Sequence, residues 1–214
     1  MKTLVLMRAR AAGLEAWLLR DLALRPWLAD APQLAVYLPA PDGPALYDAV
    51  IEVRAGPGAA AAALADADLA ARAQVWAGAC EELIGKGEAR WPAAAGMAAG
   101  PVPGVALLSF LRPLPGMERA AFLGHWRAHV ALARAVHWGM NRYGQNRMAE
   151  PLGEGEEEGW LGMAHLHFPD AHSLRHGLFR TEADKALIAA DVAGFVGAHQ
   201  TMEARWHILR NASA

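Results

Sequence analysis

The chain has 214 residues, enough for one large domain or for two domains of about 100 residues, and either can bury a core without metals or disulfides. Hydrophobic residues make up 54% of the sequence, as in globular proteins, and the net charge of −2 comes from interspersed charges of both signs. This balance argues against a nucleic-acid-binding face and against a surface for acidic lipids.

Cysteine content and hydropathy predict the compartment. Cys80 is the single cysteine, so an internal disulfide is excluded and a reducing environment fits. The apolar stretch after Lys2 is too short for a signal peptide, and no window reaches the roughly 18 uninterrupted apolar residues of a membrane helix. We therefore expect a cytoplasmic protein that does not bind membranes.

The first half, residues 1–91, predicts the order strand, helix, strand, strand, helix, strand. Apolar runs bounded by Pro and Gly clusters predict the strands, and broader apolar stripes or alanine-rich stretches predict the helices. Pro26 is expected to end or kink the first helix. The predicted strands are 3–7, 33–38, 46–53 and 82–91, and the predicted helices are 13–28 and 59–79.

The second half predicts the same order of elements. Residues 92–103 consist of Ala, Gly and Pro with one Met and one Val, which indicates a linker before a second unit at 104–214. An acidic loop at 153–159 separates the middle strands of this unit. The predicted strands are 105–111, 138–148, 160–168 and 201–209, and the predicted helices are 117–136, 171–179 and 182–189.

The stretch 111–148 carries the clearest pattern of the chain. Phe122, Trp126 and His129 recur at steps of three and four, which places an aromatic stripe containing a histidine on one helix face. In the strand that follows, Tyr143 and Gln145 alternate with the residues between them and share one side. We expect the helix to cover the other side of this strand, so that the polar side faces water or a cavity.

This stretch resembles the EthD family. The resemblance spans about 103–209 and implies a ferredoxin-like α+β module that pairs into a dimeric α+β barrel. Relatives with such a barrel include cyclases, isomerases, lyases and cofactor-free oxygenases, so a small apolar or aromatic substrate is implied. The residues that carry the resemblance are Arg112, Pro115, Gly116, Phe122, Trp126, His129, Arg142, Tyr143, Gln145 and Asn146.

The repeated order of elements predicts an α+β fold of two tandem ferredoxin-like βαββαβ modules. Each module makes a four-stranded antiparallel sheet with both helices on one face. The bare faces are several hundred Å² of partly apolar surface, which monomers rarely expose. We expect the two sheets to cover one another as an α+β barrel, and a further pairing into a homodimer stays open.

Histidines favour a site in the second half, since all nine lie there. In the strand 160–168, His165 and His167 alternate with small and apolar residues that suit packing under helices. The same reasoning turns Arg205 and His207 inward in the last strand. We therefore predict an inter-sheet pocket in the second module. The first module has no histidine, and we expect it to be a degenerate, structural copy.

Each proposed site residue has a role. The predicted catalytic residues are His129, His165 and Tyr143. The predicted substrate-binding residues are Gln145, Asn146, His167, His207, Arg205 and Trp126. Most of these side chains have a structural alternative: His129 can cap a helix end, Tyr143 and Gln145 can bond across the sheet, and Trp126 fits a core.

Metal and cofactor sites are not predicted. His125 and His129 are one helical turn apart, a spacing that can grip a metal, but a zincin glutamate and a third ligand are missing. The sequence also lacks a phosphate-binding Gly-rich loop and a nucleophile elbow.

Three functions remain compatible with the sequence. The first is an enzyme of a degradative or secondary-metabolic pathway in which a histidine moves a proton on a small hydrophobic carbonyl compound while Tyr143 or Gln145 holds the oxygen. The second is a non-catalytic protein that binds a small hydrophobic molecule or serves as an accessory protein in a degradation pathway. The third is a haem-binding barrel.

Overall fold

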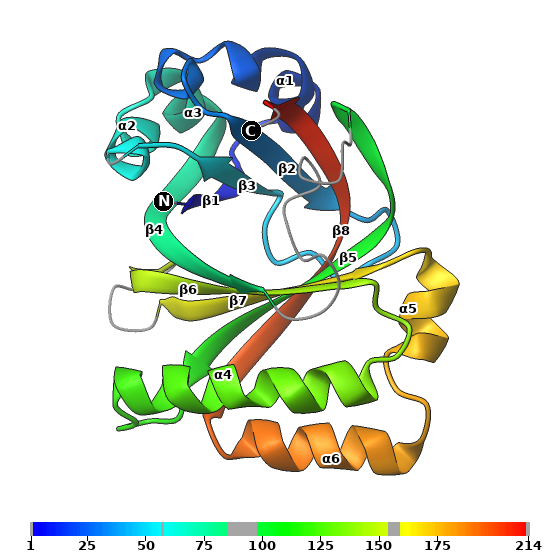
Figure 1. The fold of residues 1–214 in the computed structure, drawn as a ribbon. Coiled ribbons are helices and arrows are strands. Elements are labelled where there is room, and N and C mark those ends of the chain that lie inside the picture. The colour runs from blue at the N-terminus through cyan, green and yellow to red at the C-terminus, as the bar shows by residue number, and fades with distance from the viewer. Residues whose placement is uncertain (1, 57, 85–97, 154–158, 213–214) are drawn as a thin grey trace.

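An eight-stranded antiparallel barrel surrounded by helices forms the body of the chain (Figure 1). The computed structural model describes residues 2–56, 58–84, 98–153 and 159–212. The first half comprises β1 (Lys2–Ala9), α1 (Leu14–Asp21), the short 3-10 helices η1 (Leu22–Leu24) and η2 (Pro26–Leu28), β2 (Gln33–Pro39), β3 (Ala49–Arg54), α2 (Ala59–Leu64), α3 (Ala67–Arg72) and β4 (Ala73–Ile84). The second half comprises β5 (Gly100–Pro113), α4 (Arg119–Val136), β6 (Arg142–Leu152), β7 (Trp160–Phe168), α5 (Ala171–Gly177), α6 (Glu182–Ala193) and β8 (Val196–Asn211).

The strands close into one barrel in the order β1-β3-β2-β8-β5-β7-β6-β4. In each half the fourth strand lies beside the first, followed by the third and the second. Two seams join the halves: β2 pairs with β8, and β4 pairs with β6. The predicted α+β barrel is confirmed.

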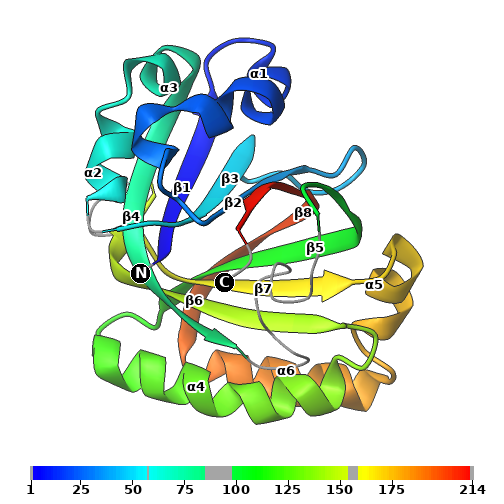
Figure 2. The same cartoon turned by 45° about the horizontal axis from the view of Figure 1, so that its top comes forward.

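The helices form two layers outside the barrel. Helices α4 and α6 run side by side under the sheet of the second half, and α1 to α3 cover the sheet of the first half (Figures 1 and 2). Separate apolar clusters fill the barrel and the space beneath each helical layer. Among the helices of the described residues, none is long and apolar enough to span a membrane.

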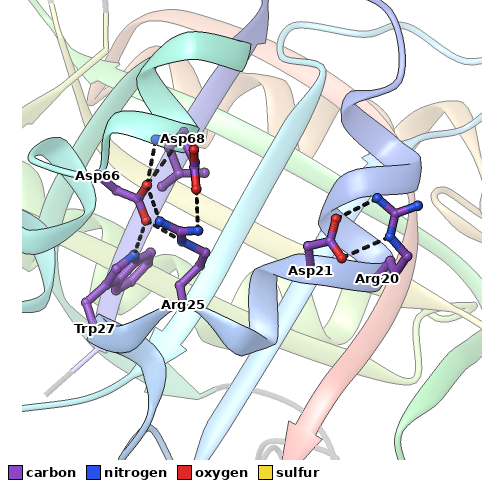
Figure 3. Close-up of polar contacts among 7 residues, drawn as sticks. Arg20, Asp21, Arg25, Trp27, Asp66 and Asp68 are labelled. Atoms are coloured by element: carbon purple, nitrogen blue, oxygen red, sulfur yellow. Dashed lines mark hydrogen bonds and ion pairs between the residues drawn. The ribbon is translucent and has the colours of Figure 1, made fainter.

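One polar cluster anchors the helical layer of the first half. The Asp66 carboxylate caps α3 by accepting hydrogen bonds from the backbone N–H groups of Asp68 and Leu69. It also accepts hydrogen bonds from the Arg25 guanidinium and from the Trp27 indole, at 2.8 and 2.9 Å (Figure 3). The segment after α1 is therefore tied to the start of α3.

Several predicted boundaries in the first half are wrong. The helix expected at 59–79 ends at Arg72, and residues 73–84 form β4, because pairing with β1 and β6 overrides the helical preference of the alanines. The helix expected at 13–28 is shorter than predicted. Helix α1 ends at Asp21, and the two short 3-10 helices η1 and η2 follow it as far as Leu28. Residues 85–91 of the predicted strand and most of the acidic loop lie outside the described residues, and β5 begins inside the range expected for the linker.

Candidate functional site

A cavity of about 390 Å³ lies between the outer face of the second-half sheet and helices α4 and α6. Most of its wall is apolar, because it consists of leucines of β5, apolar side chains of α6 and Phe195. Its size and lining fit a small organic ligand held by a few polar groups. The polar residues around it are Ser109, His129, His137, Tyr143, Lys185, His199 and Thr201.

Helix α4 brings His129 to the cavity. Phe122, Trp126 and His129 are buried on its sheet-facing side, so the predicted stripe is confirmed. The Nδ1 atom of His129 lies 2.6 Å from Asp191 Oδ2 on α6. Because a carboxylate can only accept, His129 carries its proton on Nδ1 and keeps Nε2 as an acceptor when the ring is neutral.

Asp191 is shared by two histidines. Its second oxygen, Oδ1, lies 3.2 Å from Nε2 of His125, whose ring stacks on Phe195 with centroids 4.5 Å apart. Burial acts to raise the pKa of Asp191, but the hydrogen bonds from His129 and His125 outweigh it and lower the pKa. The carboxylate thus stays ionised and fixes the orientation of His129.

Tyr143 presents a hydroxyl to the same cavity. Gln145 Nε2 donates to the Tyr143 oxygen at 3.2 Å and to the Trp126 carbonyl at 2.5 Å, which ties β6 to α4. Burial raises the pKa of Tyr143 to about 12, despite hydrogen bonds with Gln145 and Trp126 that lower it. At neutral pH the phenol therefore keeps its proton and can donate it to a ligand oxygen.

His137 is a second cavity histidine. Its Nδ1 atom donates to the Leu178 carbonyl at 2.7 Å, so Nε2 is the acceptor of the neutral ring. Burial lowers the pKa of His137, and the nearby charge of His129 adds to this, although the bond to Leu178 raises it. His137 is thus held uncharged at neutral pH.

A close approach of helix and sheet closes the cavity beside Trp126. A Cβ atom at Gly162 of β7 would lie 2.5 Å from Cζ3 of the Trp126 indole, well inside contact distance. Only glycine lets the ring lie flat on the strand here. The position of Trp126, and with it the orientation of His129 one turn later, depends on this glycine.

The cavity therefore joins an oriented imidazole and a protonated phenol inside an apolar enclosure. The imidazole can accept a proton at Nε2, and the phenol can stabilise negative charge on an oxygen. Low polarity around both groups strengthens such interactions.

His165, His167 and Asn146 lie elsewhere, inside the barrel. The ring centroids of His165 and His167 lie 5.0 and 5.5 Å from that of Trp206, which belongs to the interior cluster. Their predicted inward orientation is therefore confirmed. Asn146 donates to the Met163 carbonyl of the same interior at 3.2 Å. The prediction of an inter-sheet pocket is therefore wrong for His129 and Tyr143: their cavity lies outside the barrel, between the sheet and the helices.

The barrel histidines are held without charge. Burial lowers the pKa of His167 to about 4, with Arg142 adding to the shift and a backbone hydrogen bond to Pro103 opposing it. Burial also lowers the pKa of His165 well below its usual value, and its Nδ1 lies 3.4 Å from the Tyr37 hydroxyl. Nearby, Lys2 Nζ lies 2.8 Å from Glu52 Oε1, so these two buried charges form an ion pair.

The predicted faces of β6 and β8 are reversed. Gln145 and Tyr143 point to α4 and not to the barrel interior, because the helix offers a carbonyl and an apolar wall there. On β8, Trp206 and its apolar neighbours fill the barrel, which turns Arg205 and His207 outward.

Arg205 and His207 take no part in the cavity. The Arg205 guanidinium pairs with Glu15 of α1 through bonds of 2.8 and 3.0 Å. Of the predicted site residues, the structure brings together His129, Tyr143 and Trp126, with Gln145 behind them. Among the described residues, no group of three or more His, Cys, Asp or Glu is arranged to bind a metal.

Asp191 and His137 were missed from the sequence. Asp191 lies two residues beyond the predicted helix 182–189, in the part of α6 that the prediction left out, and its pairing with His129 depends on how α4 and α6 pack. The one available signal was the spacing of His125 and His129, which places two imidazoles on one face where a single carboxylate can meet both.

Solved structures share the fold over nearly the whole chain. A proposed monooxygenase from Lactobacillus acidophilus is 8% identical with a TM-score of 0.52, covering 100% of this chain and 97% of the other. An anthrone oxidase-like protein is 10% identical with a TM-score of 0.59, covering 100% and 95%. A proposed monooxygenase from Fusobacterium nucleatum is 9% identical with a TM-score of 0.52, covering 98% and 92%.

These identities are low, so the likeness establishes the barrel fold and no activity. No curated protein matches the sequence. The family model for the EthD domain matches residues 114–199, which include α4, β6, β7 and α6, so the second half of the chain is similar to the EthD domain.

Proposed function

We propose that the chain binds a small hydrophobic or aromatic carbonyl compound in the cavity under α4 and α6, and that His129 moves a proton on it. The observation that carries this proposal is that the Asp191-bound imidazole and the protonated phenol of Tyr143 line one apolar cavity. The reaction class is that of those lyases, cyclases and isomerases whose first step is removal of a proton beside a carbonyl.

The residues divide this step among them. Nε2 of His129 takes the proton from the carbon, and the electron pair of the broken C–H bond moves into an enolate. Tyr143 donates a hydrogen bond to the enolate oxygen, which bears the new negative charge. Asp191 stabilises the imidazolium that forms, in the way a carboxylate does behind any catalytic histidine. Return of the proton to another atom completes an isomerisation.

The name of one structural neighbour suggests an aromatic substrate. The anthrone oxidase-like protein shares the barrel fold with this chain. An anthrone is an aromatic ketone with an acidic C–H bond, so it suits the chemistry of His129 and Tyr143. An oxygenase would form the same enolate and use dioxygen as a second substrate. Proton removal is therefore the step that an isomerase-type reaction and an oxygenase reaction have in common.

Exchange of the acidic hydrogens of anthrone in D₂O, followed by mass spectrometry, tests the proposal. We expect the wild-type protein to accelerate exchange, and His129→Gln to reduce the acceleration by about 10²–10⁴-fold, the usual contribution of a general base. The matched control is His165→Gln, because His165 is a buried histidine outside the cavity. Circular dichroism of both variants establishes that they are folded.

The outcomes separate the alternatives. Loss of exchange in His165→Gln but not in His129→Gln would move the chemistry into the barrel. Binding of anthrone without accelerated exchange would make the protein a non-catalytic binder. Absence of both binding and exchange would remove aromatic ketones from consideration.

We also propose that the barrel consists of two tandem ferredoxin-like modules, one built from β1 to β4 and the other from β5 to β8, so that the second module begins at Gly100 and not at residue 104. The repeated strand order of the two halves supports this division. The first module then acts as a structural copy that supplies half of the barrel, and the EthD-like second module holds the cavity.

A further inference from the structure

A surface groove lies next to the cavity, along β8. This groove, of about 280 Å³, is lined by Ala45, Leu46, His199, Gln200 and Thr201. His199 and Thr201 also line the cavity under α4 and α6. The two hollows are therefore neighbours that share these two residues of β8.

The far wall of the groove comes from the first half of the chain. Ala45 and Leu46 belong to the segment between β2 and β3, which is fixed against β8 by two backbone hydrogen bonds. Ala40 N–H donates to the Glu203 carbonyl at 2.8 Å, and Glu203 N–H donates to the Pro44 carbonyl at 3.1 Å. The segment is held so tightly that a Cβ atom at Gly43 would lie 2.6 Å from Cβ of Glu203.

The junction between the hollows is polar. Ser109 of β5 lies opposite Thr201 of β8 in the strand register, so two hydroxyls stand side by side on the cavity floor near the groove. Gln200 adds an amide in the groove itself. Among the residues that the structure describes, the groove lining contains no Lys, Arg, Asp or Glu, so it suits a neutral hydrogen-bonding group better than a charged one.

We infer that the ligand has two parts: a flat apolar body in the cavity, and a neutral polar arm that passes Ser109 and Thr201 into the groove. This inference rests on the proposed function and specifies its substrate class. The first half then contributes to ligand recognition through Ala45 and Leu46, beyond its part in closing the barrel.

Two probes and one groove-filling variant test the inference by calorimetry. The probes are 2-naphthol and the same ring with a short oligo(ethylene glycol) arm at position 6. We expect the arm to tighten binding about tenfold, the effect of one or two hydrogen bonds. Ala45→Trp, at an exposed position, should abolish this gain and leave 2-naphthol binding unchanged. Ala61→Trp, on exposed α2, is the matched control and should change neither.

A second variant tests the same inference without introducing a bulky side chain, so its effect does not depend on steric disruption by tryptophan. Thr201→Val preserves size and removes one hydroxyl, and should reduce the gain from the arm several-fold. If 2-naphthol binds but the arm adds nothing, or if Ala45→Trp leaves the gain intact, the inference is overturned and the proposed function stands. If 2-naphthol does not bind to the wild-type protein, the inference is overturned, whereas the proposed function is decided separately by the exchange of anthrone.

Discussion

Two side chains decide what the cavity can do. His129 of α4 and Tyr143 of β6 both line it, and a hydrogen bond holds each in place: Asp191 bonds His129, and Gln145 bonds Tyr143. Such backing holds a reactive group in one orientation and one protonation state. His165 has a weaker partner, since its Nδ1 lies 3.4 Å from the Tyr37 hydroxyl and not beside a carboxylate.

His167 should make the stability of the protein depend on pH. Burial lowers the pKa of its imidazole to about 4, whereas an unfolded histidine titrates near 6.5. Between these values the unfolded chain binds the extra proton and the folded chain does not. The stabilisation is therefore complete above about pH 6.5 and is lost as the pH falls through 4, by about 3 kcal/mol at most.

Urea unfolding at a series of pH values measures this dependence. His167→Gln should flatten the fall in free energy of unfolding between pH 6.5 and 4 by roughly that amount, leaving the part due to His165. His172→Gln is the matched control, because His172 is exposed on α5. An unchanged slope in His167→Gln would show that the buried ring does not resist protonation.

At the scale of elements, one carboxylate organises the helical layer of the first half. Asp66 satisfies two backbone N–H groups at the start of α3 and the donors of Arg25 and Trp27, and its side chain is only 2% exposed (Figure 3). Short helices such as α2 and α3 do not persist without tertiary contacts of this kind.

Asp66→Ala should lower the free energy of unfolding by about 2–4 kcal/mol, because it removes an N-cap and leaves buried donors without an acceptor. The midpoint of urea unfolding measures this effect. Asp21→Ala is the control: Asp21 also bonds an arginine, Arg20, but that pair lies in solvent and should matter little (Figure 3). Equal effects of both substitutions would contradict a special role of Asp66.

The predicted faces of two strands, β6 and β8, were wrong because the face of a strand that meets a helix depends on how the elements pack. Alternation identifies which residues share a side of a strand, but not which side meets the helices. On β7, small residues mark the helix side, and the prediction holds. On β6, Gln145 is polar and still faces α4, because it bonds the Trp126 carbonyl. On β8, the apolar side fills the barrel, which no pattern in β8 itself could reveal.

At the scale of the whole molecule, the barrel and the order of its elements follow from the sequence, and the location of the cavity does not. The periodicity of α4 and the repeated element order carry the fold. The cavity requires the distance between α4, α6 and the sheet, which depends on contacts such as Trp126 on Gly162. Likewise the first part of β4, residues 73–79, was mistaken for helix, because its alanines favour a helix locally and its pairing partners are distant in the sequence.

The two halves share one interior, which predicts that they unfold together. Tyr37 of β2 stacks on Trp206 of β8 with centroids 5.6 Å apart, and β2 and β8 form a hydrogen-bonded seam. The interior cluster draws side chains from both halves, so neither half keeps its core when the other unfolds. Removal of a large side chain at this seam should therefore destabilise strands on both sides equally.

Trp206→Ala should reduce the free energy of unfolding by about 3–5 kcal/mol, the range for large aromatic side chains in cores. Hydrogen exchange followed by mass spectrometry should then show the same loss of protection in β1 and β3 as in β5 and β7, because all four strands exchange through one global opening. Trp138→Ala is the matched control at a tryptophan that is 54% exposed, and should cost far less. If protection falls only in β5 and β7, the halves are separate cooperative units, and the barrel is a docking of two domains rather than one folding unit.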